Sequence, residues 1–302
     1  MSSPTRILVT GASGQVGVDL VDTLNGVQPP GSLAAWQPDG RSVEDGEFLV
    51  TAFSHRDLDV TDRDAVVTAL RSCNADVVVN LAAYTKVDAA ERDITSCFAL
   101  NRDAPVALSE LCAERNAHLV TISTDFVFDG LKGSAYLEED VTNPLNVYGA
   151  SKREGEIGCS PSDSIVRTSW VLGVRARNVV SIVTERVSHG EPVRFVNDQV
   201  GTATFAADLA RALVTIVRER PGGLWHFANE GALSWFQLAR AVTLIITGSD
   251  ELATPISTID LVPHPVALRP IRSDLSTEQW VSRGWSEPSH WSNGLERLLA
   301  AR

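Results

Sequence analysis

The stretch "RILVTGASGQVG", Arg6 to Gly17, joins a short apolar run to a glycine-rich turn. Gly11, Gly14 and Gly17 follow the run directly and stand at the start of a helical pattern. Glycines in this position permit a tight turn and let backbone N–H groups and the positive end of a helix reach a pyrophosphate. Any tight strand-to-helix turn favours glycine, so the turn has to be interpreted with the segments around it.

Apolar, β-rich runs recur along the first half of the chain and alternate with helical patterns. The runs without polar alternation are 6–10, 48–53, 76–83, 118–124 and 164–170, which is typical of strands buried on both faces. The helical patterns between them include 16–24, 62–71 and a long one at about 95–116. This alternation predicts right-handed βαβ units in an α/β fold with a Rossmann-type doubly wound parallel sheet. The glycine turn after the first strand then indicates a dinucleotide site.

The order of elements becomes less regular after Trp170. Short strands are expected at "VRFV" and "LWHFA", and helices at 178–189, 205–218 and 235–246. We therefore predict a dinucleotide-binding domain at 1–170, to which about 203–225 also contributes, and a smaller, mainly substrate-binding α/β lobe at 171–302. Segment 26–47, rich in Pro, Gly and acidic residues, is expected to be an inserted surface loop longer than a βαβ unit needs.

Composition excludes several classes of partner. The 302-residue chain has a formal net charge of −12, which disfavours binding to nucleic acid or to an anionic membrane. No run of about eighteen apolar residues and no secretion signal is present, so we expect a cytoplasmic protein. The four cysteines show no C-x-x-C pairing and the six histidines lack metal-ligand spacing, so no metal is predicted. The chain is expected to be a monomer or a homodimer.

The end of the second predicted strand bears on the choice of dinucleotide. The sequence "AFSHRDLDV" places Ser54, His55 and Arg56 where NAD-binding proteins have Asp or Glu. Arg56 favours NADPH, with NADH possible, although an arginine in a solvated loop is the alternative. Asp59, in the next turn, is predicted to lie on the adenine side, and Val60 is also assigned to the cofactor site.

A tyrosine and a lysine stand four residues apart in "NVYGASKREGE", Asn146 to Glu156. Pro144 can start a helix after Asn143, which would put Tyr148 and Lys152 on one helical face. The ammonium is expected to lower the pKa of the tyrosine from its usual value of about 10. Tyr148 would then be a proton donor to a carbonyl oxygen, and Lys152 would also bond the nicotinamide ribose. A common helix-surface pair is the alternative.

A third candidate group follows the next strand in "TISTDFVFDG", which supplies Ser123, Thr124 and Asp125 at the carboxyl end of the fourth or fifth strand of the sheet. The Thr124 hydroxyl can donate to the same oxygen that Tyr148 protonates. Alternatively, Ser, Thr and Asp after a strand only cap a turn.

Five segments resemble the extended short-chain dehydrogenase/reductases and, more narrowly, the dTDP-4-dehydrorhamnose reductases, from about Arg6 to Trp280. They are "TGASGQVG", "DVVVNLAAYTKVDAAE", "STDFVFDG", "PLNVYGASKREGE" with "RTSWVLG", and "VNDQVGTATFAADLA". The resemblance implies NAD(P)H-dependent reduction of the 4-keto group of dTDP-4-dehydro-6-deoxy-L-mannose to dTDP-L-rhamnose, for surface polysaccharide. Hydride would pass to C4 while Tyr148 delivers the proton.

The resemblance also carries over roles by position. It implies a catalytic set of Tyr148, Lys152 and Thr124. The implied cofactor contacts are Gly11, Ser13, Gly14, Gln15, Val16, Ala82, Ala83 and Tyr84, and the implied sugar-nucleotide contacts are Thr85, Val87, Asp125, Trp170, Asn178 and Arg269. The chain departs from the family pattern at "GTAT", where Ala203 replaces a proline, and at "SDLS", Ser273 to Ser276. Asp19 stands where some members place a glutamate for a shared magnesium, so that metal is left out.

Two other functions remain open on the same scaffold. One is a sugar-nucleotide epimerase or 4,6-dehydratase, but dehydratases carry Thr-Asp-Glu where Phe126 follows Asp125 here, so a second carboxylate for acid/base work is missing at that point. The other is a non-catalytic partner protein resembling the regulatory subunit of methionine adenosyltransferase, because fold alone does not establish activity. Retention of Thr124, Tyr148 and Lys152 argues against it.

Overall fold

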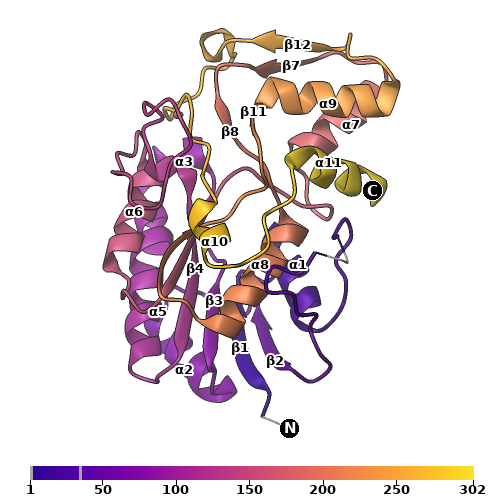
Figure 1. Cartoon of the computed structure of the whole chain (residues 1–302). Helices are drawn as coiled ribbons and strands as arrows, with labels where there is room; N and C mark the ends of the chain where they lie inside the picture. Colours follow the sequence, from indigo (N-terminus) through magenta and orange to yellow (C-terminus); the bar gives the residue numbers. More distant parts are fainter. Residues whose placement is uncertain (1–2, 34–35) are drawn as a thin grey trace.

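A six-stranded parallel sheet lies at the centre of the computed structural model, which describes residues 3–33 and 36–302 (Figure 1). The strand order is β10-β5-β4-β3-β1-β2. The strands are β1 (Thr5–Thr10), β2 (Phe48–Phe53), β3 (Val77–Asn80), β4 (His118–Thr124), β5 (Ser164–Thr168) and β10 (Gly223–His226). The direction of strand order reverses at β1, which has β2 on one side and β3 on the other. The predicted α/β doubly wound fold is confirmed, and the glycine turn after β1 lies at this switch point.

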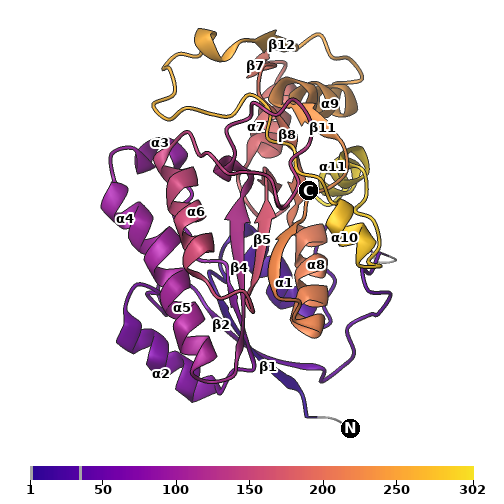
Figure 2. The same ribbon diagram turned by 60° about the vertical axis from the view of Figure 1, so that its left-hand side comes forward.

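The sheet is apolar on both faces because helices cover both. Ile7 and Val9 of β1 belong to the same core cluster as the helices α1 (Gln15–Leu24) and α8 (Ala206–Glu219). Leu8 points to the opposite face and packs with α2 (Arg63–Cys73) and α5 (Ala104–Ala113). Figure 2 shows α2, α5 and α6 (Val147–Gly158) on one side of the sheet and α1 and α8 on the other. The near-continuous hydrophobic runs in the sequence follow from this two-sided burial.

A second group of elements lies beyond the carboxyl edge of the sheet (Figure 1). Its helices are α7 (Val179–Ser188), α9 (Trp235–Thr247) and α11 (Trp291–Ala300). Its strands pair in twos, β7 (Val193–Val196) with β12 (Ala253–Ile256) and β8 (Val200–Thr202) with β11 (Ala232–Ser234). A separate cluster of buried residues, including Val183, Leu238 and Leu295, forms its core. We call this group the second lobe.

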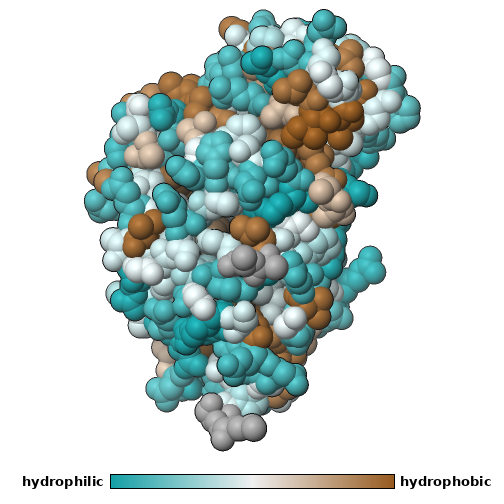
Figure 3. Space-filling view, turned by 45° about the vertical axis from the view of Figure 1, so that its right-hand side comes forward, coloured by the Kyte–Doolittle hydropathy of each residue, from teal (hydrophilic) through white to brown (hydrophobic). Residues whose placement is uncertain are grey.

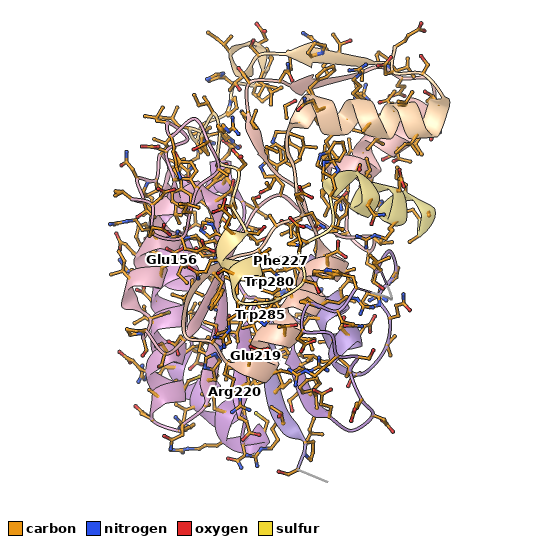
Figure 4. The ribbon with its side chains drawn as sticks, in the orientation of Figure 1. Glu156, Glu219, Arg220, Phe227, Trp280 and Trp285 are labelled. Carbon is orange, nitrogen blue, oxygen red and sulfur yellow. The ribbon has the colours of Figure 1, made fainter. Side chains whose placement is uncertain are left out.

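The chain passes between the sheet and the second lobe more than once. The pair β6 (Val171–Leu172) and β9 (Thr204–Phe205) lies at the crossing, after which α8 and β10 rejoin the sheet. Further along, α10 (Glu278–Ser282) brings Trp280 to Phe227 and Trp285 in the core of the sheet, at ring-centroid distances of 5.0 and 4.4 Å (Figure 4). Residues after Trp170 therefore contribute to both parts of the molecule. A substrate-binding role for the second lobe stays a prediction.

The inserted segment 26–47 is anchored to the body of the protein at its described residues. The indole N–H of Trp36 donates to the Glu287 carbonyl at 3.0 Å. Arg218 of α8 donates to the carboxylates of Asp39 and Glu47, at 3.0 and 2.7 Å. Arg218 is only 7% exposed and Asp39 only 3% exposed in their side chains, so this ion-pair group closes the loop against α8.

Two helix boundaries differ from the sequence-based expectation. The long helix predicted at about 95–116 is α4 (Ile94–Phe98), a π-helical turn η1 (Ala99–Asp103) and α5. Pro105 has no N–H to donate to the carbonyl four residues earlier, that of Asn101, so the regular ladder widens there. The helix predicted to start at Pro144 instead starts at Val147, because the Asn146 side chain accepts from the Gly149 N–H at 2.8 Å and caps it.

Candidate active site

A cavity of about 940 Å³ opens at the carboxyl edge of the sheet, and most of the predicted site residues line it. From the predicted cofactor set these are Gly11, Ser13, Gly14, Gln15, Val16, Asp59, Val60, Ala82, Ala83, Tyr148 and Lys152. From the predicted catalytic and substrate sets, Thr124, Thr85, Val87, Asp125 and Trp170 also line it. Segments that are distant in the sequence therefore meet at one place, as expected where parallel strands end together.

The glycine turn forms one end of the cavity. Gly11 has φ +65°, and a Cβ there would lie 2.6 Å from the Leu81 carbonyl carbon, so only glycine fits. Gly14 is the N-cap of α1 and supplies no capping side chain. The first N–H groups of α1 are therefore available to an anion, and the adjoining residues Gln15, Val16 and Gly17 line the cavity. This backbone cradle fits the pyrophosphate of a dinucleotide.

Tyr148 and Lys152 lie one turn apart on α6, facing the same cavity. The Lys152 ammonium donates to the Ile122 carbonyl of β4 at 3.0 Å, and burial lowers the pKa of Lys152 to about 8. Burial raises the pKa of Tyr148 to about 12, while the Thr124 hydroxyl acts in the lowering direction. The expected lowering of the Tyr148 pKa by Lys152 is therefore wrong for the ligand-free chain. The ammonium is occupied by a backbone carbonyl, and loss of solvent outweighs any attraction between the two groups.

The helix α6 packs so closely against the turn after β4 that there is no room for a side chain at Gly149. A Cβ at Gly149 would lie 2.1 Å from the Phe126 carbonyl oxygen, which makes glycine necessary beside Tyr148. The Phe126 ring lies edge-on to Tyr148, with centroids 5.9 Å apart and an interplanar angle of 76°. This packing fixes the tyrosine ring against the short 3₁₀ turn η2 (Asp125–Val127).

Thr124 and Asp125 share a hydrogen-bonded arrangement at the cavity wall. The Thr124 hydroxyl donates to Asp125 Oδ1 at 3.1 Å and accepts from the Phe126 N–H at 3.2 Å. Thr124 thus caps η2, which the alternative interpretation expected, and also lines the cavity. Burial raises the pKa of Asp125 to about 7, against the lowering effect of a hydrogen bond from Ser273, whose hydroxyl donates to Oδ2 at 2.6 Å.

Arg56 and Tyr84, predicted to contact the cofactor, do not line the cavity. Arg56 is exposed on the loop after β2, next to His55, which does line it. Tyr84 is tied by its backbone to Asn101, whose amide oxygen accepts from the Tyr84 N–H at 2.9 Å and whose amide N–H donates to the Tyr84 carbonyl at 3.0 Å. The Asn101 side chain therefore fixes the path of the segment that carries Ala82 and Ala83.

Two predicted substrate contacts, Asn178 and Arg269, also lie off the wall. Asn178 caps α7, and its amide N–H donates to the side-chain oxygen of Gln15 at 3.3 Å, so it touches a residue of the wall. Arg269 forms a two-point ion pair with Asp88 of α3 (Val87–Ala90), at 2.5 and 2.7 Å. The guanidinium holds the pKa of the Asp88 carboxyl well below its usual range. Their contact with a substrate stays a prediction.

Several wall residues were not singled out from the sequence. Those with polar side chains include Asn80, Thr168 and Ser169. Asn80 and Thr168 end β3 and β5, so a search for polar residues at the carboxyl ends of the predicted strands would have found them. Ser273 lies behind the wall and contacts the wall residue Asp125. No local sequence pattern could have predicted this contact, because it spans 148 residues.

Residues 3–33 and 36–302 carry neither a metal-binding cluster nor a membrane-spanning helix. That part of the chain holds no group of three or more His, Cys, Asp or Glu side chains placed to bind a metal ion. Nor does it contain a helix with the length and apolar character needed to span a membrane. Apolar residues do reach the surface, among them Leu244 and Ile245 of α9. Figure 3 shows apolar side chains gathered on part of the second lobe, at the top of the view, while the rest of that face is mainly hydrophilic or intermediate.

Three features define an enzyme of the short-chain dehydrogenase/reductase class. They are the Rossmann-type sheet, the glycine cradle at its switch point, and a helix with Tyr-x-x-x-Lys that faces the same cavity. The family model described as "RmlD substrate binding domain" matches residues 5–302. The chain is 32% identical to the dTDP-4-dehydrorhamnose reductase of Aggregatibacter actinomycetemcomitans, over 98% of each chain. It is also 32% identical to the dTDP-4-keto-6-deoxy-D-glucose reductase of Streptomyces niveus, over 97% of this chain and 96% of that one.

Solved structures agree with the sequence relatives. The dTDP-4-dehydrorhamnose reductase of Bacillus anthracis str. Ames, in complex with NADP, superposes with a TM-score of 0.87 at 29% identity, over 99% of this chain and all of that one. This protein belongs to the dTDP-4-dehydrorhamnose reductase family.

Proposed function

We propose that this chain reduces the 4-keto group of dTDP-4-dehydro-6-deoxy-L-mannose, dTDP-4-dehydrorhamnose, to dTDP-L-rhamnose with NADPH. The observation that carries the proposal is that the glycine turn, Tyr148, Lys152 and Thr124 line one cavity of about 940 Å³. The names of the relatives supply the substrate, and the NADP complex of the Bacillus anthracis protein supports the cofactor.

The residues that would hold the cofactor follow the wall from the glycine turn to α6. Gly11, Ser13, Gly14, Gln15 and Val16 would hold the pyrophosphate, and Asp59, Val60, Ala82 and Ala83 would flank the rest of the dinucleotide. Arg56 has an exposed guanidinium beside this end of the cavity, where it can pair with the additional phosphate of NADPH. NADPH, when bound, supplies the hydride for the reduction.

Tyr148 is the proton donor in this proposal. A phenol with a pKa of about 12 is protonated at neutral pH, so it can give its proton to the carbonyl oxygen as that oxygen gains negative charge. The Thr124 hydroxyl, which donates to Asp125 Oδ1 in the ligand-free chain, would turn to become a second hydrogen-bond donor to the same oxygen. Lys152, with a pKa of about 8, carries its charge at neutral pH and would stabilise the phenolate that remains.

The wall favours reduction over dehydration or epimerisation. Its carboxylates are Asp59, near the glycine turn, and Asp125. Phe126 follows Asp125 and packs against Tyr148, so the position that holds a glutamate in dehydratases is apolar here. Removing water from a sugar requires an acid and a base on either side of the bond, and no second carboxylate stands beside Asp125 on the described wall.

The test is a reductase assay with two keto sugars. The purified chain would be given NADPH with dTDP-4-dehydrorhamnose or with dTDP-4-keto-6-deoxy-D-glucose, and the product sugar would be identified by NMR. We expect NADPH oxidation and dTDP-L-rhamnose from the first. Turnover of the second sugar alone would overturn the substrate assignment and keep the reductase. NADPH binding without oxidation of either would overturn the enzymatic proposal in favour of a non-catalytic partner protein.

A further inference from the structure

Ser273 lies behind the cavity wall and reaches the wall through two side chains. Its hydroxyl donates to Asp125 Oδ2 at 2.6 Å, and Asp125 Oδ1 accepts from the Thr124 hydroxyl at 3.1 Å. All three residues are buried, with Ser273 and Asp125 each 2% exposed. A continuous line of hydrogen bonds therefore runs from a distant segment of the chain to the predicted catalytic threonine.

The backbone around Ser273 is fixed from two sides. The Ser273 N–H donates to the Val200 carbonyl of β8 at 2.9 Å. The next residue, Asp274, accepts from the Tyr136 N–H at 2.8 Å through its carbonyl. One of these partners belongs to the second lobe and the other to a loop beside the sheet, so the Ser273 hydroxyl has a defined position relative to both.

Asp125 depends on this hydroxyl because it has no ion-pair partner among residues 3–33 and 36–302. The charged groups next to Ser273 in sequence pair with each other, since the Arg272 guanidinium donates to the Asp274 carboxylate at 2.7 Å. The titratable group that faces Asp125 from α6 is Tyr148, whose ionisation Asp125 disfavours. A buried carboxylate without a cation needs its hydrogen bonds to stay ionised and in one orientation.

We propose that Ser273 is a positioning residue for the reduction: it holds the Asp125 carboxylate so that Asp125 keeps the Thr124 hydroxyl at the cavity wall beside Tyr148. This inference rests on the proposed function. With Ser273 on Oδ2 and Thr124 on Oδ1, the carboxylate cannot turn without losing both bonds. Without Ser273, Asp125 is more readily protonated and its carboxyl group is free to turn, so the contact that holds Thr124 beside Tyr148 is weakened.

The experiment compares Ser273→Ala with two controls. Ser273→Thr keeps the hydroxyl and should restore the contact. Ser276→Ala removes a hydroxyl from the same segment, one that accepts from the Glu278 N–H at 3.2 Å and does not touch Asp125. Two quantities are measured: the titration midpoint of the Asp125 carboxyl by ¹³C NMR in the ligand-free protein, and the pH profile of kcat with dTDP-4-dehydrorhamnose and NADPH. Circular dichroism confirms that each variant is folded.

We expect Ser273→Ala to raise the Asp125 midpoint by about one pH unit, since a hydrogen bond to a charged group is lost. Its kcat at neutral pH should fall about tenfold and the acidic limb of its profile should move to higher pH. Ser273→Thr and Ser276→Ala should stay within about twofold of wild type in kcat.

An unchanged Asp125 midpoint in Ser273→Ala would overturn the inference whether or not the protein is active. An active wild type with an unchanged kcat profile in Ser273→Ala would overturn the positioning role and leave the proposed function in place. A wild type that does not reduce the keto sugar would overturn the proposed function itself, and with it any role of Ser273 in that reaction.

Discussion

Burial decides the chemistry of the individual residues at the site. Lys152 and Tyr148 stand at the spacing that the sequence indicated, but loss of solvent lowers the pKa of the lysine and raises that of the tyrosine. The tyrosine is therefore a stable acid in the ligand-free chain. The spacing of four residues predicted that Tyr148 and Lys152 would face the same site. Their pKa values are decided by burial in the folded chain.

Tyr148→Phe should remove the acid and leave the ring. We expect kcat for the keto sugar to fall by about 10²- to 10⁴-fold, because only the proton transfer is lost. The Kd for NADPH, followed by fluorescence titration, should stay within about twofold. The control is Tyr136→Phe, whose ring stacks on Phe128 and whose hydroxyl donates to Asp129, outside the cavity wall. An unchanged kcat in Tyr148→Phe would refute the proton-donor role.

Arg56→Ala should change cofactor preference. The exposed guanidinium is expected to pair with the additional phosphate of NADPH, so the KM for NADPH should rise about tenfold while the KM for NADH stays nearly constant. Arg71→Ala removes another exposed arginine, at the end of α2, and should alter neither value. Steady-state kinetics with both cofactors give the answer. Equal changes for the two cofactors would show that Arg56 does not distinguish them.

At the scale of elements, side-chain contacts between distant segments hold the inserted loop and the edge strand β10 in place. The inserted segment 26–47 is bound to α8 by Arg218, and β10 places His226 in a buried group with Glu138 and Arg167. Neither contact follows from local sequence, since the partners lie far apart in the chain. Each should nevertheless have a measurable effect on the free energy of unfolding.

Arg218→Met should destabilise the protein by about 3 kcal/mol, because it leaves the buried Asp39 carboxylate and the Glu47 carboxylate without their common partner. Arg41→Met removes a second, largely exposed partner of Asp39 and should cost less than about 1 kcal/mol. Urea unfolding of the three proteins measures the difference. Similar losses for both variants would mean that the loop is not held through Arg218.

His226 should make the protein sensitive to acid. Burial, followed by the charge of Arg167, lowers the pKa of His226 to about 3 from its ordinary value of 6.5. Between these values the unfolded chain binds the proton and the folded chain does not, so this contribution to stability is present above about pH 6.5 and is lost as the pH falls towards 3. Between about pH 7 and pH 4, the free energy of unfolding of wild type, measured with urea, should fall by a few kcal/mol more than that of His226→Gln. If wild type and His226→Gln lost the same free energy of unfolding between these pH values, the lowered pKa of His226 would be contradicted.

At the scale of the whole molecule, the fold and much of the wall could be predicted from the sequence. The alternation of apolar runs and helical patterns specified the sheet, and the glycine turn and the Tyr-x-x-x-Lys spacing placed residues that do line one cavity. What could not be predicted are contacts between distant segments. Ser273 reaches Asp125 across 148 residues, and Arg269 is drawn to Asp88 across 181. No local pattern encodes such pairs.

The two parts of the molecule should unfold together, because the chain crosses between them several times and both ends of the crossing segments are packed. Trp280 and Trp285 report on the core of the sheet, and the stacked pair Trp170 and Trp235, with centroids 3.7 Å apart, reports on the second lobe. Urea transitions followed by tryptophan fluorescence and by far-ultraviolet circular dichroism should coincide. Two separated transitions would show that the lobes are independent units.

The strand order β2-β1-β3-β4-β5-β10 also has a consequence for biosynthesis. After β2 has joined β1, each later strand of the sheet adds to the same growing edge in the order in which the ribosome releases it, so the nascent sheet can extend without rearrangement. The edge of β5 stays open until Gly223–His226 has been translated, while the whole of 171–222 is being made. An unpaired apolar edge of this kind is where a newborn chain is most exposed to association with other chains.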